Sequence, residues 1–152
     1  MTIIDFSIDE SAIEEDVANS FETVSPGALE ETFFVMPVRF CVGGVEMLQL
    51  PGTESVWLPL PIFGFAADML EALESAEGNQ EKRVYLAGGG HLIFKKEGEF
   101  LSLVSSLNSK TTKVETKEIQ GAFKTFSAQV KQLLENRAPA LQQHPSWKRW
   151  FS

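Results

Sequence analysis

The chain has 152 residues, of which 43% are hydrophobic and 22% charged, and its formal net charge is −8. A chain of this length and composition can bury a core of its own, which excludes global disorder and any need for a disulfide or metal. We therefore expect a single domain over residues 1–152. It divides into an acidic N-terminal segment (1–31), an α+β core (32–136) and an aromatic C-terminal tail (137–152).

Two features bear on the compartment. The only cysteine, Cys41, cannot form an internal disulfide, and the N-terminal residues lack the basic patch and apolar run of a secretory signal. The longest apolar run, Leu58 to Met69, is interrupted by prolines, a glycine and an aspartate, so it cannot span a bilayer. We expect a cytoplasmic protein that does not bind membranes.

The negative charge is local to the N-terminal segment. Residues 1–31 contain nine acidic residues and no lysine or arginine, whereas residues 32–152 contain 12 acidic and 13 basic residues. Binding to a phosphate backbone requires a clustered basic face, and the sequence has no such cluster. We therefore expect no binding to nucleic acid.

The acidic segment has the spacing of a short helix. Ile13, Val17 and Phe21 recur every four residues, which places them on one face of a helix within residues 3–21. Asp9 or Ser11 is expected to cap its start, because their side-chain oxygens can accept the free N–H groups of a first turn.

A break at residues 25–27 precedes a change to a period of two. Residues 33–50 alternate between apolar and polar side chains around Gly43 and Gly44, which predicts a β-hairpin. Pro37 has no N–H to donate to a neighbouring strand, so we expect its strand to lie at a sheet edge or at a bulge.

The rest of the chain predicts one strand, two helices and a meander. A strand at 56–60 precedes a helix that begins at Ile62 and ends near Gly78, and a long helix covers 119–134, with Thr116 as N-cap. The meander strands are expected at 83–87, 91–95, 99–105 and 111–116. The fold class is therefore α+β: a mostly antiparallel sheet of about six to seven strands against a central and a long C-terminal helix, with a short acidic N-terminal helix.

No pattern predicts catalysis. The glycine run 88–90 before His91 invites comparison with a phosphate loop, but the following residues predict a strand where such a loop would open a helix. Cys41 and His91 could form a nucleophile and base, although Cys41 sits in an apolar strand. Two distant histidines, His91 and His144, and one cysteine do not make a zinc site, and calcium-loop spacing is lacking. We expect no enzyme activity, cofactor or metal.

Two groups of residues are candidates for binding a partner. Glu14, Glu15 and Asp16 would attract a basic surface, and the simpler interpretation is a solvated helix face. Trp147 and Trp150 lie beside two cations in the tail, and the simpler interpretation is that they close the core over the C-terminal helix.

These observations favour a non-catalytic protein-binding module, of the bacterial inhibitor or immunity protein kind, that acts on a basic partner. The first alternative follows from the order of elements, which is similar to that of small acidic secretion chaperones and would imply a homodimer that holds an extended segment. A small-molecule-binding domain is the second alternative. Self-association separates the first two hypotheses, because an inhibitor can be monomeric.

Overall fold

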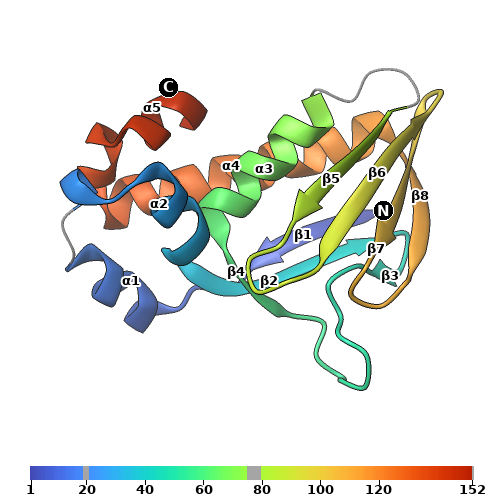
Figure 1. Cartoon of the computed structure of the whole chain (residues 1–152), viewed down its shortest axis with the longest axis horizontal. Helices are drawn as coiled ribbons and strands as arrows, with labels where there is room; N and C mark the ends of the chain where they lie inside the picture. The colour runs from blue at the N-terminus through green and yellow to red at the C-terminus, as the bar shows by residue number, and fades with distance from the viewer. Residues whose placement is uncertain (19–20, 75–79, 152) are drawn as a thin grey trace.

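The computed structural model describes residues 1–18, 21–74 and 80–151 (Figure 1). Within them the chain forms eight strands in two four-stranded antiparallel sheets, together with five helices and two short 3-10 segments. The expected α+β class is confirmed, but the strands form two sheets in place of one. The elements are β1 (Thr2–Phe6), α1 (Glu10–Val17), η1 (Phe21–Thr23), α2 (Pro26–Thr32), β2 (Val35–Val42), β3 (Val45–Glu46), β4 (Leu58–Pro61), α3 (Ile62–Glu74), β5 (Glu81–Tyr85), β6 (His91–Glu97), β7 (Phe100–Ser105), β8 (Thr111–Glu115), α4 (Thr116–Arg137), η2 (Pro139–Gln143) and α5 (Pro145–Phe151).

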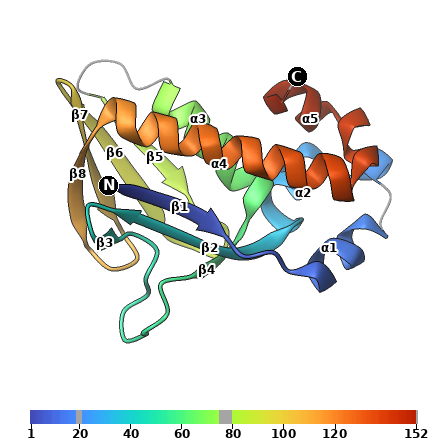
Figure 2. The ribbon, with the colours of Figure 1, turned by 180° about the vertical axis from the view of Figure 1, so that it is seen from behind.

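The two sheets have different orders. In the first sheet β2 is central, with β1 on one side and both β3 and β4 on the other, whereas the second sheet is the expected meander β5-β6-β7-β8. Helices α3 and α4 pack against each other and cover the sheets, and α4 runs along the length of the molecule (Figure 2). Strand β1 contacts α4, and β5 contacts α3.

The core is built around α4, as the sequence predicted. Phe123 and Phe126 are fully buried, and Phe123 meets Phe40 of β2 edge to face with ring centroids 5.2 Å apart. Phe65 of α3 packs against both α4 rings, at 6.0 and 6.2 Å. The apolar stripe therefore joins α3, α4 and the first sheet into one hydrophobic cluster.

The N-terminal region differs from the sequence prediction. Asp9 caps α1 by accepting from Ala12 N–H at 3.2 Å, as expected, but α1 ends at Val17, which is 37% exposed, and Phe21 lies in η1. Residues 2–6 form the strand β1, although residues 3–6 fall in the segment where the sequence predicted only a helix, because they pair with β2. Ser25 and Pro26 start α2 in place of a break, because Ser25 accepts from Ala28 N–H and proline suits the first turn of a helix.

The prediction that Pro37 marks an edge or bulge is wrong, since it lies in the central strand β2. The N–H of Ser7 donates to the Pro37 carbonyl at 2.9 Å, immediately past the end of β1. Pro37 cannot return a bond to Ser7, so the pairing between β1 and β2 ends there. On the β4 side Pro37 faces Pro59, in a register where no bond between the two residues is required.

The ends of several helices and strands also differ from the sequence prediction. The Gly43-Gly44 turn is confirmed, with φ of 56° and 83°, but β3 has only two residues. The expected end of the central helix at Gly78 lies outside the described residues. The N-cap of α4 is Glu115, which makes no side-chain bond, and Pro145 begins α5 where the sequence predicted a broken tail.

Among the described residues, no helix is long and apolar enough to cross a membrane.

Candidate functional site

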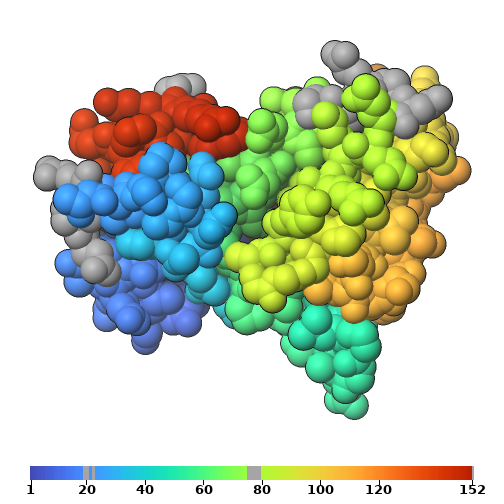
Figure 3. All heavy atoms as spheres, viewed as in Figure 1, coloured from blue at the N-terminus to red at the C-terminus, as the bar shows by residue number. Residues whose placement is uncertain are grey.

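An open groove lies between β5 and the helices α2 and α3. It has a volume of about 680 Å³. One wall is formed by the end of α2 and by α3, and the other by β5 and the turn that follows it, residues 82–88. The space-filling view shows the surface hollowed between the α2 region and β5, with α3 behind (Figure 3). We refer to this cavity as the β5 groove.

The α3 side of the β5 groove is a single helical stripe. Gly64, Phe65, Asp68, Glu71 and Ala72 recur at the spacing of one helix face, and all of them line the groove. Phe65 and Ala72 are almost fully buried, whereas Asp68 and Glu71 are exposed. The stripe thus supplies an apolar floor and two carboxylates directed to the same space.

Gly64 brings α2 into this wall. A Cβ atom at Gly64 would lie 1.9 Å from the carbonyl oxygen of Glu30, so the two helix backbones touch at a distance that only glycine permits. This contact places Glu30 and Glu31, the last acidic residues of the N-terminal segment, beside the carboxylates of α3. The helical wall therefore carries four carboxylates from two elements.

Charges in the β5 groove are not paired across it. Lys82 and Arg83 line the opposite wall, and no ion pair among the described residues joins them to the helical carboxylates. Glu30 Oε1 accepts a hydrogen bond from Trp150 Nε1 at 2.8 Å, which fixes this carboxylate from behind the wall. The charged groups that line the groove therefore have unused bonding capacity in the free protein.

The pKa of Asp68 reports the electrostatic character of the helical wall. Partial removal from water is the largest cause that raises this pKa from 3.8 to about 6, and repulsion from Glu30, Glu71 and Glu31 adds to it. Asp68 keeps contact with solvent, so the groove walls remove only part of its hydration. A cation near Asp68 would favour its ionised form.

The carboxylates are too dispersed to hold one metal ion. Across the described ranges 1–18, 21–74 and 80–151, no three His, Cys, Asp or Glu side chains come together as a metal site. Calcium and magnesium need several oxygen ligands around one ion. The helical wall is therefore better matched to cationic groups spread along a ligand.

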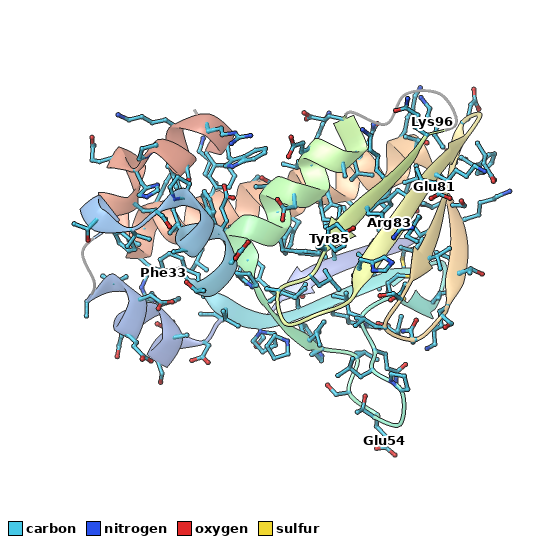
Figure 4. All side chains as sticks on the ribbon, viewed as in Figure 1. Phe33, Glu54, Glu81, Arg83, Tyr85 and Lys96 are labelled. Atoms are coloured by element: carbon cyan, nitrogen blue, oxygen red, sulfur yellow. The ribbon has the colours of Figure 1, made fainter. Side chains whose placement is uncertain are left out.

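The other wall is the outer edge of a sheet. Strand β5 is the first strand of its sheet and pairs only with β6. Consecutive residues from Lys82 to Gly88 line the groove, which means that the edge of the strand borders it, since one face would contribute alternate residues only. Figure 4 labels Arg83 and Tyr85 on β5, and Phe33 just past the end of α2.

The hydrogen-bond register shows which backbone groups face outward. Leu86 N–H donates to Gly90 O at 2.9 Å, and hydrogen-bonded pairs alternate along an antiparallel ladder. The bonded pairs therefore include Val84 with Leu92, and the N–H and C=O groups of Arg83 and Tyr85 point away from β6. The bond from Ser106 N–H to His91 O, on the far side of β6, agrees with this register.

The acidic candidates Glu14, Glu15 and Asp16 lie on α1, which is remote from β5 (Figure 1). Glu14 and Glu15 are exposed, whereas Asp16 is half-buried and accepts from Phe34 N–H at 2.7 Å. Phe34 has a φ of 54°, which is unusual for a bulky residue. Asp16 thus holds the turn between α2 and β2, and partial burial raises its pKa although the Phe34 bond opposes the rise.

The tryptophan candidates pack into the fold. Trp147 is buried and its ring stacks against Phe63, with centroids 6.4 Å apart. Trp150 is half-buried and donates to Glu30, while Arg149 lies 4.8 Å from its ring. These positions match the interpretation that the tail closes the core. Trp150 also reaches the β5 groove indirectly, because it orients Glu30.

The cysteine and histidines do not form a site. Cys41 is buried in β2, where burial raises the pKa of its thiol, and His91 begins β6 in the other sheet. No hydrogen bond joins these two side chains within the described residues. His144 is buried, contacts the Val24 carbonyl at 2.7 Å and accepts from Ser146 N–H. The glycine run 88–90 forms the expected hairpin turn between β5 and β6, with positive φ at all three residues.

The sequence predicts an acidic segment that contains Glu30 and Glu31, but it does not predict the groove. Asp68 and Glu71 lie beside the apolar stripe of their helix, and Gly64 next to Phe65 is the sequence signal of a close helix contact.

No family model, curated protein or solved structure matches this chain.

Proposed function

We propose that the protein is a non-catalytic protein-binding module, and that it receives a segment of a partner bearing lysine or arginine in the β5 groove. The observation that carries this proposal is the helical wall: Asp68 and Glu71 face an open groove together with Glu30 and Glu31, and none of them forms an ion pair with a described cation. Complementary charge steers encounter and selects among partners.

The shape of the groove favours a chain segment over a small molecule. Its volume is within the range of about 300–1,000 Å³ that small-ligand sites occupy, but such sites are mostly apolar and enclose their ligand. The β5 groove is open along one side (Figure 3), and charged residues line both walls. An extended peptide segment can place its cationic side chains against Asp68 and Glu71 along this open side.

The wall is also organised in advance of binding. Gly64 fixes the distance between α2 and α3, and Trp150 orients Glu30, so little ordering remains when a partner arrives. A cation that approaches Asp68 relieves the repulsion that raises the pKa of this group. Inhibitors and immunity proteins of basic partners would use such a surface, and so would a chaperone that holds an extended segment.

The test is binding of a fluorescent nonapeptide of alternating valine and lysine, compared with the matched peptide of alternating valine and glutamate. We expect the lysine peptide to bind and the glutamate peptide not to bind. Glu71→Gln should weaken binding several-fold, and Glu74→Gln should not, because Glu74 lies on α3 outside the groove lining. Equal binding of both peptides, or equal effects of both variants, would contradict the proposal.

A further inference from the structure

Strand β5 is an open sheet edge. At the other end of its sheet, β8 lies against the first sheet, where Thr112 Oγ1 donates to Val42 O at 3.3 Å. In the first sheet, β1 lies against α4, and β4 contains Pro59 and Pro61, which have no N–H to offer. Edge strands are usually covered or blocked in these ways, because their free backbone groups can pair with another chain. Strand β5 contains no proline and borders the groove.

The open edge has two backbone sites in register. Arg83 and Tyr85 each direct an N–H and a C=O away from β6, as the ladder alternation requires. Apart from the ladders within strands, no backbone hydrogen bond among the described residues uses these groups. Because Arg83 and Tyr85 are two residues apart, their outward N–H and C=O groups have the spacing with which an added strand forms hydrogen bonds.

The helical wall opposite β5 bears on which occupant can add to this edge. The helical wall of α2 and α3 stands opposite β5 along the same cavity. A second copy of this chain would bring its own β5 with β6 attached, and β6 would meet that wall. An isolated extended segment has no second strand attached to it and avoids this obstacle.

We propose that the partner segment adds to the second sheet as a strand on the free edge of β5, bonded to the backbones of Arg83 and Tyr85. The side chains of this strand alternate in direction, so those on the helical side carry lysine or arginine to Asp68 and Glu71. The backbone bonds supply affinity that is independent of sequence, and the carboxylates select basic segments. This inference rests on the proposed function and specifies how the partner binds.

The test is amide hydrogen exchange with and without the valine–lysine nonapeptide. In the free protein the amides of Lys82 and Val84, bonded to β6, should exchange slowly, and those of Arg83 and Tyr85 should exchange rapidly. Saturating peptide should slow exchange at Arg83 and Tyr85 by about tenfold or more. If the peptide binds and both amides stay unprotected, strand addition is wrong while the proposed function survives.

A pair of variants separates the backbone from the side chain. Arg83→Pro removes the outward N–H and the charge, whereas Arg83→Thr removes the charge only and suits a strand. We expect Arg83→Pro to bind the peptide about tenfold more weakly than Arg83→Thr, with both variants retaining the thermal transition of a folded protein. Equal affinities of the two folded variants would overturn the proposal. No binding by the parent at about 1 mM peptide would overturn both the inference and the proposed function.

Self-association is measured on the same samples. We expect the parent to sediment as a monomer at the concentrations of the exchange experiment. A dimer with Arg83 and Tyr85 protected in the absence of peptide would assign the edge to a second copy and overturn the inference.

Discussion

Gly64 of α3 touches the backbone of α2 at Glu30, where an added Cβ atom would lie 1.9 Å from the Glu30 carbonyl oxygen. This contact sets the position of the acidic wall, because Glu30 and Glu31 belong to α2 and Asp68 and Glu71 to α3. The two helices are separated in the sequence by the β2–β4 region, so the wall exists only in the folded chain.

Gly64→Ala should therefore damage both stability and binding. The methyl group must push α2 away, and overpacking of this kind costs about 1–3 kcal/mol. The matched control is Gly121→Ala in α4, where an added Cβ meets nothing within 4 Å. That change should stabilise the protein by about 0.5–1 kcal/mol, because alanine favours a helix. Denaturant unfolding checks both, and equal effects would show that the helix contact is not tight.

We expect Asp16 to stabilise the fold through its hydrogen bond with Phe34. Asp16→Ala removes the acceptor of the Phe34 N–H and should cost about 1–3 kcal/mol, since Phe34 is buried with a strained φ of 54°. Asp16→Asn keeps an oxygen in place and should cost much less. Glu14→Ala, at an exposed position on the same helix, should change stability little. Thermal unfolding of the three variants measures this, and an unaffected Asp16→Ala protein would contradict the assignment.

Ionisation of Asp68 should lower stability as the pH rises. Its pKa is raised from 3.8 to about 6 in the fold, so the folded state holds this proton more tightly than the unfolded chain does. The stability that the protonated form contributes is lost between these two pH values. Asp68→Asn should therefore raise the thermal midpoint relative to the parent more at about pH 8 than at about pH 4. A difference between the two proteins that does not change with pH would refute this.

The hydroxyl of Thr116 should be dispensable. Its Oγ1 is buried and has no hydrogen-bond partner among the described residues. Thr116→Val keeps the shape and removes the unpaired polar atom, and we expect a gain of about 1–3 kcal/mol in unfolding free energy. Thr125→Val, at an exposed position of α4, serves as the control and should have little effect. A loss of stability at Thr116→Val would indicate that the hydroxyl has a partner.

The sequence predicts the parts of this fold whose signals are local and long. The stripe through Phe123 and Phe126 repeats over four turns, and the turns at Gly43-Gly44 and 88–90 require residues that tolerate positive φ. Strand β1 and helix α2 escaped prediction because each is short, and both depend on partners distant in the chain. The edge position predicted for Pro37 is wrong because the nitrogen of Pro37 faces the end of β1, a strand that the sequence did not predict.

The β5 groove could not be predicted because its walls meet only in the folded chain. Glu30, Asp68 and Arg83 are ordinary surface residues when each is considered along its own element. The charge excess of residues 1–31 pointed to a basic partner, but it did not separate Asp16, which holds a turn, from Glu30 and Glu31, which line the cavity. That distinction comes from two contacts of the folded chain: Gly64 against Glu30, and Asp16 with the N–H of Phe34.

The central claim is that the carboxylates of the β5 groove bind cationic side chains, and the salt dependence of peptide affinity tests it most directly. The dissociation constant of the valine–lysine nonapeptide is measured over a range of ionic strength for the parent, for the double variant Asp68→Asn/Glu71→Gln, and for Glu74→Gln. The account predicts a steep weakening with salt for the parent and for Glu74→Gln, and a shallower dependence with lower affinity for the double variant. Identical salt dependence in all three proteins would contradict it.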